Sequence, residues 1–366
     1  MWLLFCAIAP AVMWLGLLLL PWRPWSTREH LEADPFADIR LDEITILIPA
    51  RNEADVLGST LRALQRQGEG LQVIVVDDQS SDSTASIARS YPNVQVIAGA
   101  PLPEGWAGKL WALEQGRRHV RTPMILLLDA DIELRPGMLC TLLQHKQRDQ
   151  RQFVSIMADL RRSSFWDRLL LPAFVYYFKL LYPFAVSNSR SKLVAAGAGG
   201  CMLMDTELLE RTGAFASLRD ALIDDCALAR QVKRAGGRTW IGLSRDVVSL
   251  RPYGSFSSIH QMVARSAFTQ LGYSSSVLLV VTALFLLAYG APLLLLGSSL
   301  WPWSWLALLA MMAGYLPMLR YYGMRPWWAL LLPLGAGLYL AMTWSSALRY
   351  WRGVRSQWKG RVYRAG

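Results

Sequence analysis

The chain has 366 residues, of which 53% are hydrophobic and 18% are charged, and its formal net charge is +11. This composition is too apolar for an ordinary soluble enzyme, and the length is sufficient for one to three domains. The apolar residues collect at the two ends of the chain, whereas the middle has the composition of a normal α/β protein. The cysteines lie far apart without a CxxC or Cys/His cluster, which argues against a disulfide framework or a structural zinc site and suits a reducing cytosolic compartment.

Residues 1–23 are predicted to form an amino-terminal transmembrane anchor. The segment 2–22 is apolar and uncharged, and about 20 such residues cross a bilayer as a helix. A signal peptide requires a positively charged residue before its apolar segment, and no Lys or Arg precedes this one. Arg23 and Trp25 follow the segment, as interfacial residues do. A cleaved signal peptide is the alternative interpretation.

Residues 40–250 are predicted to form an α/β domain around a mostly parallel sheet. Apolar runs typical of strands covered on both faces occupy 44–48, 73–76 and 124–128, and a further strand is expected at 94–97. A helix is expected at 53–67, between the first two strands. Ligands bind beyond the carboxyl ends of the strands in such sheets, so the residues that follow these strands are expected to face one crevice.

Two aspartates directly follow the fourth strand, in the sequence Asp129-Ala-Asp131. Hard divalent cations such as Mg²⁺ and Mn²⁺ bind carboxylate and phosphate oxygens together. Asp129 and Asp131 are therefore predicted to hold a metal ion, and Asp129 also to contact the nucleotide diphosphate whose charge that ion neutralises.

The ends of the first two strands are predicted to form the wall of a nucleotide pocket. The residues expected there are Pro49, Ala50, Arg51, Glu53, Asp77 and Asp78. An aspartate at the end of the second strand suits the imide N–H of uracil. Asn52 and Asp82 are more typical of helix caps.

Lys109 and the loop 105–109 precede another expected helix, and a cation together with backbone amides suits a pyrophosphate. A plain loop with a solvated lysine is the alternative. Asp224 and Asp225 open a later helix, where one acid, preferably Asp225, would serve as general base for an acceptor hydroxyl. Acids at that position also stabilise a helix amino terminus without any catalytic role.

The segment at about 165–186 is apolar and aromatic but too broken by prolines for a comfortable span, so we expect an interfacial helix; a buried core helix is the alternative. Residues 251–274 are expected at the membrane edge. There, Arg265 would stabilise the leaving diphosphate with Gln261 nearby, unless Arg265 only reaches toward the membrane surface.

Residues 275–348 contain three apolar segments, at 275–296, 300–319 and 327–348. With a cytosolic catalytic domain, three full spans would place the basic tail 349–366 outside, yet Arg320, Arg325 and the tail favour the cytoplasm. The last segment is therefore predicted to be re-entrant or interfacial. The tail itself is expected to meet anionic lipid headgroups and not nucleic acid.

These motifs, in this order, resemble family 2 of the inverting nucleotide-sugar glycosyltransferases, which have the GT-A fold. A closer likeness is to the hopene-associated glycosyltransferases of bacterial hopanoid gene clusters. It rests on the stretches 105–111 (GWAGKLW), 165–170 (FWDRLL), 199–203 (GGCML), 222–229 (LIDDCALA), 262–266 (MVARS) and 358–363 (WKGRVY).

The resemblance implies a UDP-sugar donor, Mg²⁺ or Mn²⁺, inversion at the anomeric carbon and a polyisoprenoid-type lipid acceptor. Some related membrane enzymes carry a Gln/Arg-x-x-Arg-Trp motif, from which Gln261-x-x-x-Arg265-Ser266 departs in spacing and in its last residue.

The sequence thus predicts a metal-dependent hexosyltransferase in the bacterial cytoplasmic membrane, with several membrane helices and a cytosolic catalytic domain. Two other functions fit parts of the sequence. A nucleotidyltransferase acting on a lipid-linked substrate would release pyrophosphate in place of UDP. A lipid-binding protein with a degenerate transferase domain would not turn over the donor.

Overall fold

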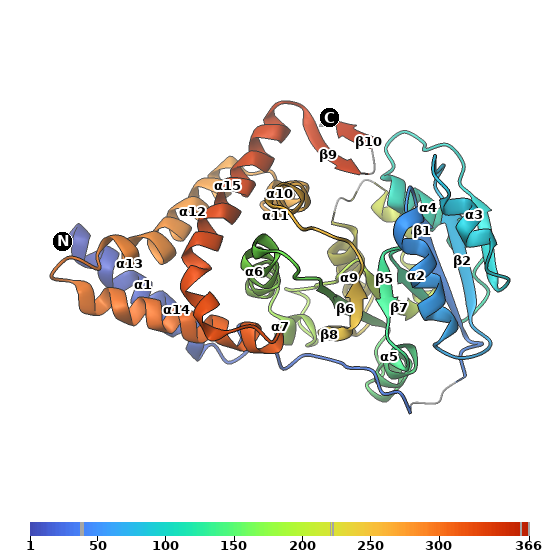
Figure 1. Cartoon of the computed structure of the whole chain (residues 1–366), viewed down its shortest axis with the longest axis horizontal. Helices are drawn as coiled ribbons and strands as arrows, with labels where there is room; N and C mark the ends of the chain where they lie inside the picture. Colours follow the sequence, from blue (N-terminus) through green and yellow to red (C-terminus); the bar gives the residue numbers. More distant parts are fainter. Residues whose placement is uncertain (37–39, 220, 222, 359–360, 365–366) are drawn as a thin grey trace.

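The structure, a computed structural model, describes residues 1–36, 40–219, 221, 223–358 and 361–364, with side chains described up to Val354. A mixed sheet lies at one side of the molecule and a group of long apolar helices at the other (Figure 1). The strands of the sheet are β1 (Ile44–Ala50), β2 (Gln72–Asp77), β3 (Val94–Ala98), β4 (Met124–Leu128), β5 (Ile132–Leu134), β6 (Phe153–Leu160), β7 (Cys201–Asp205) and β8 (Thr239–Ser249).

The strand order in the sheet is β3-β2-β1-β4-β7-β6-β8-β5. Four of the seven pairings are parallel and three are antiparallel, so the prediction of a mostly parallel sheet is confirmed. The four predicted strands correspond to β1 to β4, which form the parallel half. The strands β5 to β8 were not predicted, and they bring the rest of the site to the sheet.

Helices cover both faces of the sheet. Their bounds are α2 (Ala54–Gln65), α3 (Thr84–Arg89), α4 (Gly108–Arg117), α5 (Met138–Arg148), α8 (Thr206–Arg211), η1 (Phe215–Leu218) and α9 (Asp224–Arg234). One core contains apolar residues of α2 and α5, among them Leu57, Leu61 and Leu142. A second core, with Leu113 and Val232, packs α4 and α9 against the sheet. Burial on both faces explains why β4, and β1 apart from Thr45, are apolar.

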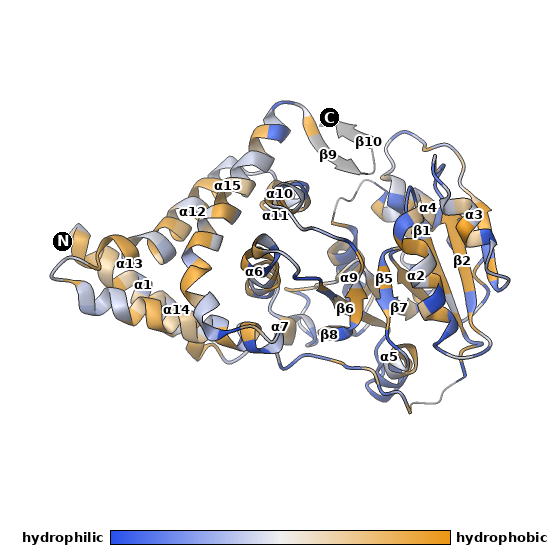
Figure 2. Ribbon diagram, viewed as in Figure 1, coloured by the Kyte–Doolittle hydropathy of each residue, from blue (hydrophilic) through white to orange (hydrophobic). Residues whose placement is uncertain are grey.

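A second group of helices carries the apolar ends of the chain (Figure 2). These are α1 (Trp2–Leu19), α12 (Ser275–Phe285), η2 (Leu286–Gly290), α13 (Ala291–Leu294), α14 (Trp301–Tyr321), η3 (Pro326–Leu331) and α15 (Leu332–Trp351). Four helices within the described residues are long and apolar enough to cross a membrane, and they lie at the two ends of the chain as predicted. A small hairpin of β9 (Val354–Trp358) and β10 (Arg361–Arg364) follows, and the side chains of most of the basic tail lie outside the described residues.

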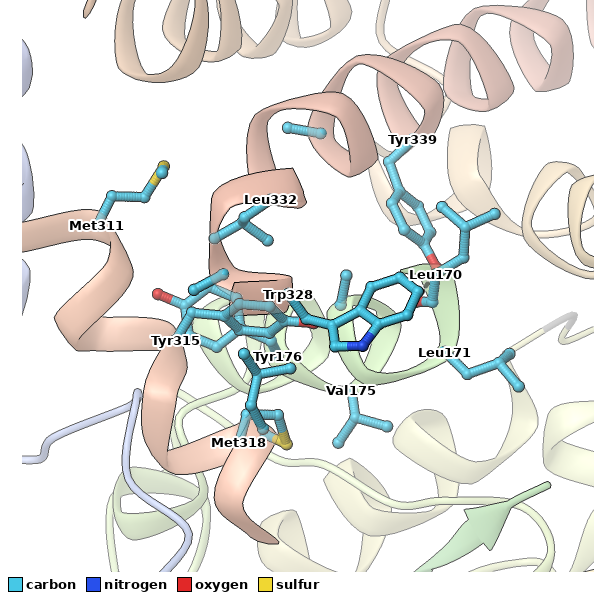
Figure 3. Close-up of a cluster of buried hydrophobic side chains, with 14 of the residues drawn as sticks. Leu170, Leu171, Val175, Tyr176, Met311, Tyr315, Met318, Trp328, Leu332 and Tyr339 are labelled. Atoms are coloured by element: carbon cyan, nitrogen blue, oxygen red, sulfur yellow. Dashed lines mark hydrogen bonds between the residues drawn. The ribbon is translucent and has the colours of Figure 1, made fainter. Parts of the chain in front are cut away.

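The helix α6 (Phe165–Leu181) lies between the two groups and is followed by α7 (Phe184–Ser187). Its residues Leu170, Leu171, Val175 and Tyr176 pack against α14 and α15 in one core (Figure 3). A capping box of Ser164 and Asp167 starts the helix, which continues through Pro172 in its interior. The protein-facing side of α6 is buried, and its place at a membrane surface stays a prediction.

The segment after α1 forms a strap, residues 29–34, along the catalytic domain. Leu31 N–H donates to the carbonyl of Leu243 in β8, and Leu243 N–H donates to the carbonyl of Glu29, both at 2.9 Å. The Glu29 carboxylate also pairs with the buried Lys179 of α6 at 2.9 Å. Ala33 N–H donates to Asp246 at 2.8 Å. The strap therefore ties the amino-terminal helix to the sheet.

Candidate active site

A cavity of about 470 Å³ opens at the carboxyl ends of β1 and β4. Its polar end is lined by Pro49, Glu53, Lys109, Asp129, Asp131, Asp224, Asp225 and Arg251. Seven of these eight residues were predicted to be functional. The carboxyl ends of β1 and β4 and the start of α9 therefore meet at one site, although α9 lies almost a hundred residues further along the chain.

Lys109 lies between three carboxylates. Its ammonium nitrogen lies 2.7 Å from Asp129 Oδ1 and 4.0 Å from Asp224 Oδ2, and it donates to the carbonyl of Gly199 at 3.2 Å. Burial alone would lower the pKa of Lys109, but attraction to Asp129, Asp224 and Asp225 outweighs it and raises the pKa. Lys109 therefore stays charged, as a phosphate-binding group requires, and the solvated-lysine alternative does not fit its position.

Asp131 is held by Arg251, which the sequence analysis did not single out. Arg251 Nε lies 2.8 Å from Asp131 Oδ2, and an Arg251 guanidinium nitrogen lies 3.6 Å from Glu53 Oε1. The cause is the register of β5 and β8, which places Ile132 opposite Ser249 and so brings the residues after β8 to Asp131. Burial raises the pKa of Asp131, and the positive charge of Arg251 offsets only part of that effect.

Asp225 accepts two backbone hydrogen bonds. Gly199 N–H donates to its Oδ2 at 2.9 Å, and Cys226 N–H donates to its Oδ1 at 2.7 Å. A side chain at Gly197 would not fit, because its Cβ would lie 2.7 Å from the carbonyl oxygen of Asp225. Burial, together with repulsion from Asp224, raises the pKa of Asp225 to about 6. A carboxylate with this pKa is ionised at neutral pH and is a stronger base than an ordinary aspartate.

The pH dependence of turnover follows from the raised pKa of Asp225. A general base acts only when deprotonated, so we expect kcat/KM to fall about tenfold per pH unit below an apparent pKa of about 6 and to level off above it. Initial rates in buffers of constant ionic strength would measure this. A profile that stays flat down to about pH 4, near the ordinary pKa of aspartate, would contradict the role of Asp225.

The predicted nucleotide wall lies beside the cavity and only partly lines it. Pro49 and Glu53 are lining residues, whereas Ala50, Arg51, Asp77 and Asp78 are not. A guanidinium nitrogen of Arg51 donates to the carbonyl of Asp78 at 2.5 Å and lies 4.0 Å from its carboxylate, which is fully buried. Arg51 and Asp78 thus hold the ends of β1 and β2 together, and the uracil contact stays a prediction.

The helix α10 (Phe256–Ala264) borders the cavity and is followed by α11 (Ala267–Gln270). Arg265, which follows the last turn of α10, lines the cavity and is exposed. Gln261 is not a lining residue, and its amide lies 3.5 Å from Ser257 Oγ one turn earlier. The structure therefore brings Arg265 to the site and leaves Gln261 on the outer face of its helix.

The residues of the polar end fit a hard divalent cation in a particular way. No cluster of three or more His, Cys, Asp or Glu suited to a metal is found among the described residues. Mg²⁺ and Mn²⁺ at phosphate sites need only one or two carboxylates, because phosphates and waters complete the shell. Asp129, whose side chain is 33% exposed, and Asp131 supply that number at the cavity.

The other end of the cavity is apolar and reaches the long helices. Its lining includes Phe174, Tyr177, Phe178 and Leu181 of α6, Val281 and Phe285 of α12, and Tyr339 and Thr343 of α15. This apolar arm was not predicted, because its residues come from three helices distant in sequence. It joins the charged cluster to the part of the molecule that is apolar enough to enter a bilayer.

Comparison with known proteins identifies the fold and the domain. The chain is similar to the mannosyltransferase PcManGT of Pyrobaculum calidifontis, solved in complex with GDP-Man and Mn²⁺, with a TM-score of 0.57 and 20% identity over 94% of this chain and 99% of that one. Glucosyl-3-phosphoglycerate synthase of Mycobacterium tuberculosis, solved with Mn²⁺ and UDP-glucose, aligns with a TM-score of 0.44 and 16% identity over 67% of this chain and 86% of that one. The alignment with PcManGT over 94% of this chain shows the GT-A fold, as predicted.

Residues 45–213, just under half of the chain, match the sequence profile described as Glycosyl transferase family 2. A 4,4'-diaponeurosporenoate glycosyltransferase of Staphylococcus aureus (strain USA300) is 36% identical over 115 residues, which are 31% of this chain and 31% of that protein. The match thus spans about a third of the length of this curated relative.

Proposed function

We propose that this protein is a membrane-bound inverting glycosyltransferase that moves a sugar from a nucleotide-sugar donor to the hydroxyl of a lipid. The observation that carries the proposal is that one continuous cavity joins the charged cluster around Asp129 and Asp225 to the apolar arm. A substrate that fills both ends needs a polar head and a long apolar chain. The bacterial cytoplasmic membrane, with the catalytic domain on the cytosolic side, is the compartment that offers both substrates.

The donor would bind at the polar end of the cavity. Asp129 and Asp131 would hold Mg²⁺ or Mn²⁺, which when bound neutralises charge on the diphosphate and makes it a better leaving group. Lys109 lies beside Asp129, where its ammonium would contact a phosphate oxygen. Arg251 fixes the orientation of Asp131, and Arg265 offers a second cation at the rim of the cavity. PcManGT, solved with GDP-Man and Mn²⁺, supports nucleotide-sugar and metal use by this fold.

The acceptor would react in one displacement at the anomeric carbon. Its hydroxyl oxygen forms the new bond on the face opposite the diphosphate, the bond from the anomeric carbon to the diphosphate oxygen breaks, and Asp225 takes the hydroxyl proton. Configuration is inverted, and no covalent sugar–enzyme species forms. UDP is the expected leaving group, and a hopanoid or other polyisoprenoid alcohol is the expected acceptor class, on the strength of the sequence motifs.

Membranes that contain the full chain test this proposal. We expect incubation with radiolabelled UDP-sugars and Mn²⁺ to yield a labelled, organic-extractable lipid together with free UDP, and the Asp225→Asn variant to yield about 10²–10⁴-fold less of both. Radiolabelled GDP-mannose serves as the alternative donor. Release of pyrophosphate would instead identify a nucleotidyltransferase, and absence of turnover with every donor would favour the non-catalytic alternative.

The apolar arm makes a separate prediction about the acceptor. A bulky residue at Val281, which lines the arm, should obstruct the lipid chain, so we expect Val281→Trp to lower lipid glycosylation about tenfold, the effect of roughly 1.4 kcal/mol. Donor binding, measured by UDP titration with Mn²⁺, should be unchanged. The neighbouring Val280 is 58% exposed and lies outside the lining, so Val280→Trp is the matched control. Equal activity of the two variants would exclude the arm as the acceptor site.

A further inference from the structure

The last apolar helix, α15, stays beside the catalytic side of the molecule along its whole length. Just before its start, Trp328 of η3 contacts Phe165 of α6, with ring centroids 5.6 Å apart. In its middle, the Tyr339 hydroxyl donates to the carbonyl of Leu170 at 2.8 Å. Near its end, Ser346 Oγ accepts the N–H of Phe268 in α11 at 3.1 Å. A helix from residue 328 to 346 rises about 27 Å, so these contacts with the catalytic side extend over a length close to the thickness of a bilayer core.

The two ends of α15 lie beside the ends of two other helices, α14 and α12, that are nearest to the catalytic domain. The segment that connects α14 to α15 begins at Tyr321 and Tyr322. The Tyr321 hydroxyl lies 3.5 Å from Glu32, and the guanidinium of Arg162 lies 4.5 Å above the Tyr322 ring, so this end of α14 contacts the catalytic domain. At its other end, Tyr350 stacks on Tyr273, which directly precedes α12, at 4.4 Å. The helix therefore connects the domain-side ends of α14 and α12, as its course in Figure 1 shows.

The middle of α15 also lines the active-site cavity. Tyr339 and Thr343 share that cavity with Asp129 and Asp225. Both residues belong to the apolar arm, at the other end of the cavity from this charged cluster. A helix that lies in the plane of the membrane would cover that arm.

The outward face of α15 and the segment before it is apolar. Leu330, Leu334 and Leu348 are exposed by 60%, 50% and 45%, and Gly337 and Ala341 are exposed between them. Spacings of three, four and seven residues place these positions on one helix face, and the first charge on the helix is Arg349 at its end. A helix with one face packed on protein and an uncharged opposite face suits the boundary between headgroups and acyl chains.

We propose that α15 lies in the plane of the membrane as a roof over the active site, and that only α1, α12–α13 and α14 cross. The uncharged loop 295–300 and the exposed Trp301 and Trp303 then lie at the far surface. Arg320, Arg325 and Arg349 all lie on the side of the catalytic domain. Three crossings with the domain and the carboxyl terminus on the same side also satisfy the positive-inside rule, which four crossings do not. This inference concerns placement and is independent of the proposed activity.

Cysteine labelling of the full chain in intact cells tests the side of the tail. In a Cys6→Ala background, Val354→Cys reports the tail, Ser299→Cys the loop between α13 and α14, and Glu69→Cys the catalytic domain. With a membrane-impermeant maleimide we expect labelling of Ser299→Cys from outside, and labelling of Val354→Cys and Glu69→Cys only after permeabilisation. Labelling of Val354→Cys together with Ser299→Cys would overturn the proposal, as would protection of Ser299→Cys in intact cells.

The depth of α15 gives a second, independent test. Spin labels at Leu334→Cys, Ala341→Cys and Leu348→Cys, in the protein reconstituted into phosphatidylcholine–phosphatidylglycerol vesicles, should report one shallow depth from their relative access to oxygen and a water-soluble nickel complex. Labels on the exposed α14 positions Leu306, Leu309 and Ala313 serve as the control and should report depths that change along the helix. A similar gradient along α15, or a deep Ala341 between two shallow ends, would refute an in-plane helix.

Discussion

Replacement of Asp225 by Asn is expected to reduce sugar transfer about 10²–10⁴-fold, the usual contribution of a positioned general base, while metal-dependent UDP binding is retained. The amide is close to the carboxylate in size and keeps an oxygen that can accept one of the two backbone hydrogen bonds from Gly199 and Cys226. It cannot accept a proton from a hydroxyl at neutral pH. Titration of UDP with Mn²⁺ present, beside lipid-product formation, separates the two effects.

Asp224 provides the matched control for this experiment. It is adjacent in sequence, belongs to the same helix end and lies 4.0 Å from Lys109, but unlike Asp225 it has no hydrogen bond from the Gly199 backbone. If it only stabilises the start of α9, Asp224→Asn should cost about 0.3–1 kcal/mol of stability and leave transfer largely intact. Inactivity of Asp224→Asn with an active Asp225→Asn would move the base by one residue. Full activity of both variants would place the base elsewhere.

Replacement of Asp129 by Asn is expected to weaken both metal-dependent nucleotide binding and turnover, the latter by at least about 10²-fold, since a bound metal contributes several kcal/mol to a leaving diphosphate. Asp129 is the more exposed of the two candidate ligands and also pairs with Lys109 at 2.7 Å. Its loss would therefore remove a proposed metal ligand together with the ion-pair partner of Lys109.

Calorimetric titration of UDP with and without Mn²⁺ checks this prediction. The wild-type protein should bind UDP more tightly with Mn²⁺, and Asp129→Asn should show little difference between the two conditions. A chelator should inactivate the wild-type protein, and Mn²⁺ or Mg²⁺ should restore it. Equal UDP affinity of Asp129→Asn and wild type with Mn²⁺ present would rule out Asp129 as a metal ligand.

The parallel half of the sheet was predictable because its signals are local. The run 124–128 is apolar at every position, and the structure has β4 at Met124–Leu128, directly before Asp129. The antiparallel half was not predicted. In β8 the sequence contains Ser244, Arg245 and Asp246, so that no continuous apolar run or strict alternation marks the strand.

Which residues of the candidate site the sequence could single out depends on whether their signal is local. Lys109, Asp129 and Asp225 each stand next to a strand end or a helix start, where short patterns are informative. Arg251 reaches Asp131 only through the register of β5 and β8, strands that are more than a hundred residues apart. Such a contact depends on long-range pairing, which a single sequence does not display. The apolar arm depends in the same way on the packing of α6, α12 and α15.

The strap at 29–34 has a consequence for which lipids could react. About ten residues separate the end of α1 from Glu29, and from there the backbone is bound to β8 and to Lys179 of α6. If α1 crosses the membrane as proposed, the strap would keep the catalytic domain from rising from the bilayer or swinging on a tether. Asp225 would then stay at a constant height above the acyl chains, and this height would select the acceptor. A hydroxyl carried close to the hydrocarbon would meet the carboxylate, whereas one at the tip of a long hydrophilic headgroup would pass beyond it.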